Sequence, residues 1–127
     1  MLKKMAHTSL KVSNLECSKR FYTKIIGLEH VKDTANEDYY FSLLKVGDSV
    51  IELLESRTKH YETKTTGPID HIAFWVDDLD DTIEELKSND IKILMREPKI
   101  VGMSKIFFIE GPDKERIELM EDISTII

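Results

Sequence analysis

Apolar and polar positions alternate along several short segments in the first half of the chain, and one segment between them has helical spacing. Alternation with a period of two predicts strands, whereas apolar residues spaced from Leu15 to Ile26 predict a helix that ends at Gly27. The predicted strands are residues 5–12, 28–33, 39–46 and 49–55, with turns at 34–37 and 47–48. The first half is therefore predicted to form a βαβββ module.

The same order of elements recurs in the second half of the chain. The predicted elements are a strand at 69–76, a helix at 79–87, strands at 91–95, 103–110 and 115–121, and a hairpin turn at 111–114. A module this small cannot bury its sheet face alone, so such modules occur in pairs. We therefore expect an α+β fold in one domain over residues 1–127, with modules at about 5–56 and 69–122, a connection at 57–68, and a curved mixed sheet around a metal-containing cleft.

The two predicted modules also repeat a short motif that contains chemically useful residues. The sequence IELLE at 51–55 returns as IELME at 117–121, and His7 returns as His71. The two histidines are 64 positions apart, and the glutamates Glu52 and Glu118 are 66 apart. Each module therefore contributes one histidine and one glutamate at matching positions, and a pseudo-two-fold relation between the modules would bring the four together.

Strand alternation predicts the direction in which these four side chains point. Ile51 and Leu53 share the face that packs under the helix, which leaves Glu52 on the opposite face, and Glu118 repeats this arrangement. In the strand at 69–76, His71 and Trp75 are predicted to share the face away from the helix. Glutamate is depleted in strands and is rarely buried without a partner, so its repeated place between two aliphatic residues requires a partner such as a metal or an arginine.

Two imidazoles and two carboxylates suit a divalent transition metal, with Zn²⁺ or Ni²⁺ preferred and Co²⁺, Mn²⁺ or Fe²⁺ as alternatives. The absence of thiolates argues against a structural zinc site. A metal with four protein ligands can still take water or two substrate oxygens and act as a Lewis acid. Taken singly, a histidine in a strand is more often structural and an outward glutamate more often solvated, so it is the paired spacing that favours metal binding.

Composition narrows the class of protein and its location. The formal net charge is −6, and no cluster of basic residues extends beyond a pair, so nucleic acid and anionic membranes are poor candidate partners. No apolar run approaches the roughly 18 residues that a membrane span needs, and the N-terminus lacks the apolar core of a signal peptide. The single cysteine, Cys17, fits a reducing compartment. We therefore expect a cytoplasmic protein that acts on a small molecule. The two other histidines, His30 and His60, are expected to lie on the surface.

The repeated motifs resemble those of the vicinal oxygen chelate superfamily, which includes glyoxalases, bleomycin-resistance proteins and extradiol dioxygenases. The sequence from His7 to Val12, with Asn14-Leu15, Phe21-Tyr22 and Gly27-Leu28, looks like that family's first repeat. The stretches 70–74, 107–113 and 116–119 look like its second repeat. The resemblance covers nearly the whole chain and implies paired βαβββ modules, which in members of this size often form homodimers.

Within the superfamily, the order of ligands His7, Glu52, His71 and Glu118 is similar to that of the glyoxalase I, or lactoylglutathione lyase, branch. This resemblance implies a hemithioacetal substrate, formed from a 2-oxoaldehyde such as methylglyoxal and a thiol. Glu118 would move a proton from C1 to C2 through an enediolate that the metal stabilises, and Glu52 would be its pseudo-symmetric counterpart.

Two departures from the bacterial glyoxalase pattern concern the thiol. Lys11 stands where glutathione-using members usually carry arginine, and Ser56 stands where they carry asparagine. Lysine keeps the charge but loses the bidentate fork that binds a carboxylate. We take Lys11, Ser56 and Trp75 as candidate substrate-binding residues, although Trp75 could equally be a packing residue. A dioxygenase, an epimerase, a thiol transferase and a non-catalytic ligand-binding or resistance protein are the alternative functions.

Overall fold

The computed structural model describes residues 1, 6–58 and 71–125, which fall into two compact units, Met1–Thr63 and Lys64–Ile127. Most of the predicted connection at 57–68 lies outside the described residues. The candidate surface residue His60 lies in that part of the chain. Among the described helices, none is long and apolar enough to cross a membrane. That the two units form one domain stays a prediction.

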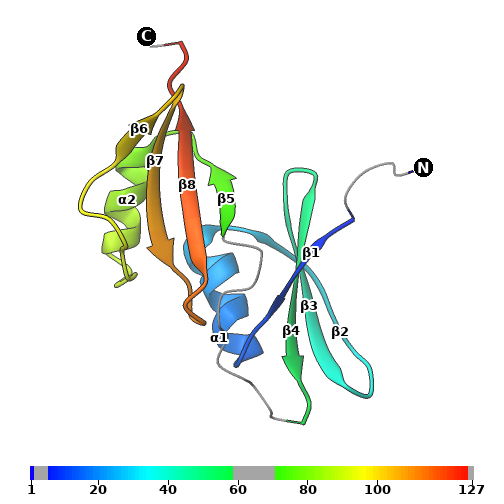
Figure 1. Ribbon diagram of the computed structural model, residues 1–127. Coiled ribbons are helices and arrows are strands. Elements are labelled where there is room, and N and C mark those ends of the chain that lie inside the picture. The colour runs from blue at the N-terminus through cyan, green and yellow to red at the C-terminus, as the bar shows by residue number, and fades with distance from the viewer. Residues whose placement is uncertain (2–5, 59–70, 126–127) are drawn as a thin grey trace. The chain divides into compact units, whose positions relative to one another are not determined.

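The first unit has the βαβββ order that the sequence predicts (Figure 1). Its elements are β1 (Thr8–Lys11), α1 (Leu15–Arg20), a π-helical segment (Phe21–Ile26), β2 (Glu29–Ala35), β3 (Tyr39–Val46) and β4 (Ser49–Ser56). The strands form a mixed sheet in the order β1-β4-β3-β2, with β1 parallel to β4 and the other pairs antiparallel. The helical region ends at Gly27 as predicted, because its φ of 101° lies in the left-handed region that glycine adopts readily.

The second unit repeats this topology with its own sheet in the order β5-β8-β7-β6, β5 being parallel to β8. Its elements are β5 (Ile72–Trp75), α2 (Leu79–Lys87), β6 (Lys99–Val101), β7 (Ser104–Glu110) and β8 (Arg116–Asp122). The α+β fold with paired βαβββ modules is therefore confirmed.

One predicted strand, at 91–95, is wrong. This segment runs beside β7 through a single bridge between Ile93 and Ile109, and the edge strand of the sheet is instead β6. From Ile93 to Lys99 the chain advances six positions, whereas the facing positions on β7, Ile109 and Ile106, differ by three. The surplus residues loop out and interrupt the ladder, so the alternation of apolar residues at 91–95 does not become a strand.

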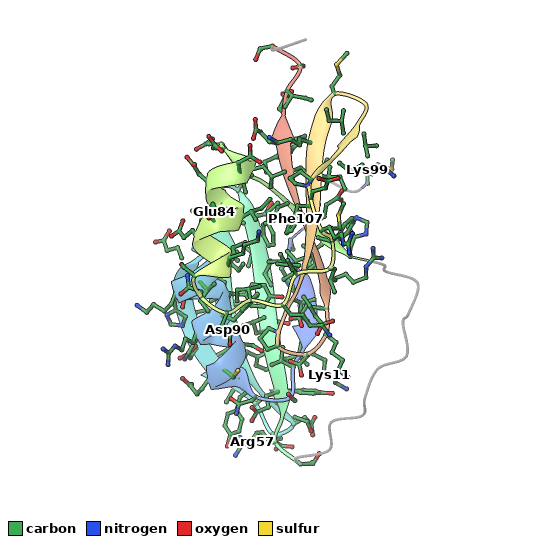
Figure 2. The ribbon with its side chains drawn as sticks, turned by 90° about the vertical axis from the view of Figure 1, so that its left-hand side faces the viewer. Lys11, Arg57, Glu84, Asp90, Lys99 and Phe107 are labelled. Atoms are coloured by element: carbon green, nitrogen blue, oxygen red, sulfur yellow. The ribbon has the colours of Figure 1, made fainter. Side chains whose placement is uncertain are left out.

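Each unit has its core between its helix and one face of its sheet, since α1 lies against β3 and β4, and α2 against β7 and β8. Phe107 of β7, for example, is 1% exposed and lies on the side that faces α2 (Figure 2). The buried apolar residues are Val12, Leu15, Phe21, Tyr22, Leu28, Leu44, Ile51 and Leu53 in the first unit, and Leu79, Ile83, Leu86, Ile106, Phe107, Ile109, Ile117, Leu119 and Ile123 in the second.

A glutamate near the end of the motif strand ties each helix to its sheet. Oε1 of Glu55 in β4 accepts a hydrogen bond of 2.6 Å from the backbone N–H of Leu15, and Oε1 of Glu121 in β8 accepts one of 2.7 Å from Leu79. Both donors are the first residues of helices, where backbone N–H groups lack intrahelical partners and a negative charge is favoured. The last glutamate of each repeated motif therefore has a structural role that positions the helix.

Candidate active site

The first unit brings His7 and Glu52 together on the face of the sheet opposite α1. His7 lies directly before β1, and Glu52 lies in the middle of the neighbouring parallel strand β4. Nε2 of His7 is 3.8 Å from Oε1 of Glu52, and the two side chains are 44% and 20% exposed. Burial alternates as predicted, because Ile51 and Leu53 on either side of Glu52 are buried against the helix.

The second unit brings His71 and Glu118 together in the same way. His71 lies directly before β5, and Glu118 lies in β8, the parallel neighbour of β5. Nε2 of His71 is 3.0 Å from Oε1 of Glu118, and these side chains are 34% and 15% exposed. The repeat in the sequence is thus matched by a repeat of His–Glu pairs, each within one unit.

The spacing of the His71–Glu118 pair fits two ligands of a single metal ion, whereas the His7–Glu52 pair is wider. Nitrogen and oxygen ligands bind such ions at about 2.1 Å, and two of them at an angle of about 90–110° are about 3.0–3.4 Å apart. The 3.0 Å separation of His71 and Glu118 lies in this range, and the 3.8 Å separation of His7 and Glu52 is slightly longer. In neither unit do three or more His, Cys, Asp or Glu side chains gather for metal binding among the described residues. Each unit therefore offers two donors among its described residues, half of the four ligands that the sequence predicts.

The two pairs have different neighbours, which the sequence repeat did not reveal. Ser9 pairs with Glu52 across the sheet, and its hydroxyl donates a hydrogen bond of 2.8 Å to Oε1 of Glu52. The residue that pairs with Glu118 from β5 is Ala73, which has no hydroxyl to donate. Beside His71, the ring of Phe108 makes an edge-to-face contact at 5.3 Å. The Ser9 hydroxyl that bonds Glu52 therefore has no counterpart beside Glu118, whose carboxylate lies 3.0 Å from Nε2 of His71.

The candidate substrate-binding residues lie on both units. Lys11 is exposed at the end of β1 (Figure 2), with its ammonium 5.8 Å from the ring of Tyr39, and Tyr39 in turn pairs with Ser56 across the sheet. The structure thus places Lys11 and Ser56 around Tyr39, a residue that the sequence reasoning did not select. Ser56 shares a hydrogen bond of 2.7 Å with the hydroxyl of Thr58. Trp75 in β5 is 66% exposed, which is unusual for a residue with only a packing role.

The remaining residues singled out in the sequence lie on the surface. His30 is exposed as predicted, with Nε2 2.8 Å from Oδ1 of Asp33, and Cys17 is exposed near the start of α1. The N–H of Cys17 is bonded by the side chain of Asn14, which caps the helix.

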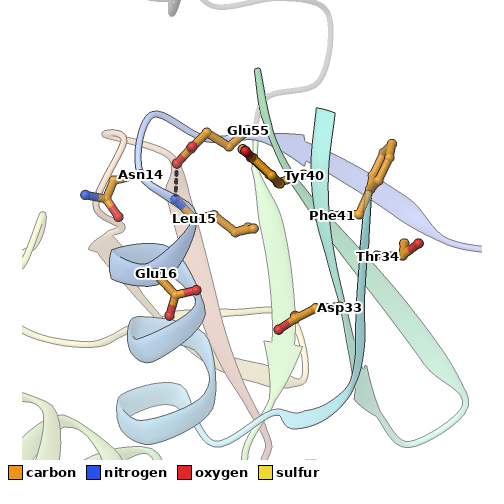
Figure 3. Close-up of a pocket in the computed structure, with 8 residues that line it drawn as sticks. All are labelled: Asn14, Leu15, Glu16, Asp33, Thr34, Tyr40, Phe41 and Glu55. Atoms are coloured by element: carbon orange, nitrogen blue, oxygen red, sulfur yellow. Dashed lines mark hydrogen bonds between the residues drawn. The ribbon is translucent and has the colours of Figure 1, made fainter. Parts of the chain in front are cut away.

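A cavity of about 400 Å³ lies at the N-terminal end of α1 and is lined by Asn14, Leu15, Glu16, Asp33, Thr34, Tyr40, Phe41 and Glu55 (Figure 3). Its wall includes the bond from Leu15 to Glu55, drawn dashed in Figure 3, so this cavity borders the helix rather than the Glu52 pair. It therefore contributes none of the four candidate ligands.

Comparison with known proteins agrees with the βαβββ fold of the two units. Residues 4–119 match the model of the Glyoxalase/Bleomycin resistance protein/Dioxygenase superfamily. The chain belongs to this superfamily. Among its relatives, the lactoylglutathione lyase of Escherichia coli O157:H7 is 33% identical over 94% of this chain and 93% of that protein.

Solved structures of superfamily members share the fold. The trypanothione-dependent glyoxalase I of Leishmania major is 25% identical, with a TM-score of 0.79 over 98% of this chain and 90% of that one. A glyoxalase family protein from Enterococcus faecalis superimposes with a TM-score of 0.79 at 23% identity, over 94% and 98% of the two chains. The resemblance seen in the sequence is thereby confirmed, as is the prediction of an enzyme similar to lactoylglutathione lyase.

Proposed function

We propose that this superfamily member isomerises the hemithioacetal of a 2-oxoaldehyde, such as methylglyoxal, and a thiol, which is the reaction type of lactoylglutathione lyase. The observation that carries the proposal is the duplicated His–Glu pair, His7 with Glu52 and His71 with Glu118, at repeat-related positions in the two units. Similarity to lactoylglutathione lyase over nearly the full length of both chains supports it.

We assign all four side chains as ligands of one divalent ion, Zn²⁺ or Ni²⁺ in the first place and Co²⁺, Mn²⁺ or Fe²⁺ as alternatives. Each unit offers two donors among its described residues, so the complete set needs a pair from each kind of module. The ion, when bound, would supply Lewis-acid polarisation of the substrate oxygens and so acidify the adjacent C–H bond. The two imidazoles and two carboxylates of this chain would hold the ion and orient it toward the substrate.

The proton transfer is assigned to Glu118. Its carboxylate would take the proton from C1 of the hemithioacetal, while the electron pair of that bond moves toward C2, and would then return a proton to C2. Glu52 is the pseudo-symmetric counterpart, but Ser9 restrains it through a hydrogen bond of 2.8 Å. Ala73 offers no hydroxyl to Glu118, whose carboxylate instead lies 3.0 Å from Nε2 of His71.

Four residues are assigned to substrate recognition. Lys11, Ser56 and Trp75 would contact the thiol portion of the substrate, and Tyr39, which lies beside the first two, is added to this group. The protein would act as a cytoplasmic homodimer on a small molecule, without nucleic-acid or membrane partners.

The proposal is tested by turnover and metal content together. Protein loaded with each candidate metal is mixed with methylglyoxal and glutathione, or another cellular thiol, and product formation is followed. We expect turnover by the wild type and a loss of about 10²- to 10⁴-fold in kcat for Glu118→Gln, the range of a general base. Glu29→Gln, at an exposed position of the edge strand β2, is the matched control and should leave kcat unchanged.

Elemental analysis supplies an independent readout. We expect one ion per set of four ligands in the wild type and a lower content in Glu52→Gln and Glu118→Gln. The absence of turnover with every metal and several thiols would overturn the proposed reaction. Oxygen consumption with Fe²⁺ would instead indicate an oxygenase, and stoichiometric ligand binding without turnover would indicate a sequestering protein.

A further inference from the structure

The face of the second sheet that carries Glu118 also carries a row of three apolar residues. Trp75 in β5 pairs directly with Met120 in β8, and Met120 pairs on its other side with Ile106 in β7. Residues that pair across strands share a face, and Met120 follows Glu118 by two positions, so this apolar row lies on the Glu118 face, about 7 Å along the strand. The apolar row is therefore next to the candidate reacting centre.

Exposure decreases along the apolar row. Trp75 is 66% exposed, Met120 is half-buried and Ile106 is 6% exposed. One step further from the reacting centre, the positions that follow Met120 and precede Ile106 on this face are the polar residues Asp122 and Ser104, which pair with each other. The apolar row is therefore open at Trp75 and narrow along the strands. A protein partner needs a far larger surface, whereas one ring or one short chain of a small molecule fits.

The equivalent row of the first unit shows that the fold does not require an exposed indole. There Lys11 pairs with Leu54, and Leu54 pairs on its other side with Phe41. The two inner positions are apolar in both units, so packing within each sheet accounts for them. The position on the edge strand differs, because the first unit has an ammonium where the second has the indole of Trp75. The exposed indole is therefore particular to the second unit.

The chemistry of the apolar row suits an apolar group of a small molecule. Ligand sites are lined mainly by apolar and aromatic side chains, with a few polar groups placed at the reacting atoms. An indole offers a large flat face for a ring or a chain, and a methionine adapts its shape to what lies beside it. Because Glu118 stands in the neighbouring row, a group that lies on Trp75 and Met120 is within reach of the molecule whose proton Glu118 would move.

We propose that Trp75, with Met120 beside it, is a specificity-determining residue that binds an apolar substituent of the substrate, a single ring or a short hydrocarbon chain. The inference rests on the proposed function for the reacting group, and it narrows the substrate class to hemithioacetals that carry such a substituent. The substituent can come from the thiol or from the 2-oxoaldehyde. Since Trp75 is assigned to the thiol portion above, the thiol is the expected source.

The first experiment measures binding without turnover. 2-(Benzylthio)ethanol and 2-(methylthio)ethanol, two thioethers that have no aldehyde-derived centre to react, are titrated calorimetrically into the metal-loaded protein. Trp75 is the only tryptophan in the sequence, so the fluorescence of the wild type reports on the surroundings of this residue. We expect the benzyl compound to bind about 10-fold or more tightly than the methyl compound, in the range for an apolar contact. Its binding should also shift the emission of Trp75 to shorter wavelength, because it displaces water from the indole.

Three variants show whether Trp75 causes this preference. Trp75→Lys takes the residue type of Lys11, which the same topology accommodates, and it should remove the preference for the benzyl compound. Trp75→Phe keeps an aromatic face and should retain part of the preference. Ile100→Ser is the matched control and should bind both compounds as the wild type does. Ile100 is 64% exposed in the same unit, but it pairs with Lys105, whose ammonium bonds Asp80 of α2 on the other face of the sheet.

Turnover then identifies the source of the apolar group. Hemithioacetals are prepared from methylglyoxal or phenylglyoxal with 2-mercaptoethanol or phenylmethanethiol, and kcat/KM is measured for each. We expect Trp75→Lys to lower the ratio of kcat/KM for the phenylmethanethiol substrates to that for the 2-mercaptoethanol substrates by about 10-fold or more. If the ratio for phenylglyoxal to methylglyoxal falls instead, the apolar site is retained and its ligand is the aldehyde-derived group.

Two results would overturn the inference. Emission of Trp75 that is already at short wavelength in the free protein, and that acrylamide does not quench, would show that protein atoms cover the indole. Equal losses for both thioethers and for all four hemithioacetals in Trp75→Lys would show a structural role.

The outcomes also distinguish this inference from the proposed function. Binding of the benzyl thioether that depends on Trp75, in a protein that turns over no hemithioacetal, would retain the apolar site and reject the reaction. Turnover with the same substrate ratios in Trp75→Lys and in the wild type would retain the reaction and reject the assignment of Trp75.

Discussion

Replacing Glu55 by alanine removes the side chain that anchors the start of α1 to the end of β4. The carboxylate accepts a 2.6 Å hydrogen bond from the N–H of Leu15, a part-buried contact between residues 40 positions apart. Loss of a side-chain acceptor at a helix N-terminus costs about 0.5–2 kcal/mol, and loss of a negative charge there costs about 0.3–1 kcal/mol. We therefore expect Glu55→Ala to lower the free energy of unfolding by about 1–2 kcal/mol.

The assay is thermal and urea unfolding of purified variants. A loss of that size corresponds to a fall in Tm of about 4–7 °C for a chain of this length. Glu55→Gln keeps an acceptor oxygen but loses the charge, so its loss should be smaller, about 0.3–1 kcal/mol. Glu121→Ala, which removes the equivalent 2.7 Å bond to Leu79, should resemble Glu55→Ala. Glu29→Ala, at an exposed position, is the control. If Glu55→Ala unfolds at the same urea concentration as Glu29→Ala, the anchoring role is refuted.

Three further changes test other parts of the molecule. Ser9→Ala removes the hydroxyl that bonds Glu52. Because the loss of a residue that orients a ligand weakens metal binding, a metal titration should show an affinity for the metal reduced about 10- to 100-fold. An unchanged affinity would contradict this role of Ser9. Gly27→Ala places a side chain at a residue whose φ is 101°, a backbone conformation that alanine rarely adopts. Urea unfolding should therefore show a free energy of unfolding lowered by about 1 kcal/mol or more. A variant that is more stable than the wild type would show that the position is not strained. The ammonium of Lys19 lowers the pKa of Asp33, with a smaller contribution from His30, so this pair stabilises the fold above pH of about 4 and the contribution disappears as pH falls further. Asp33→Asn should therefore reduce stability at neutral pH and flatten its dependence on pH below that value; an unchanged acid-unfolding curve would contradict the assignment.

The sequence alone predicted those features that depend on local geometry. A period of two positions fixes which side chains share a strand face, so the outward positions of Glu52 and Glu118 followed from their aliphatic neighbours. The bounds of β3 and α2 were predicted because turn and capping residues mark them clearly, Gly47 and Asp78 among others. The internal repeat also places one histidine and one glutamate at matching positions in each module.

Register and the contacts between distant strands were decided only by the tertiary structure. Residues 91–95 have the alternation of a strand, but the surplus positions between Ile93 and Lys99 prevent a continuous ladder with β7. The hydroxyl of Ser9 meets Glu52 from 43 positions away because β1 and β4 are parallel neighbours. In the same way, Arg116 and Phe108 meet because β8 and β7 pair in one register. Periodicity determines the face on which a side chain lies, whereas its partner on that face depends on which strands are neighbours and in what register they pair.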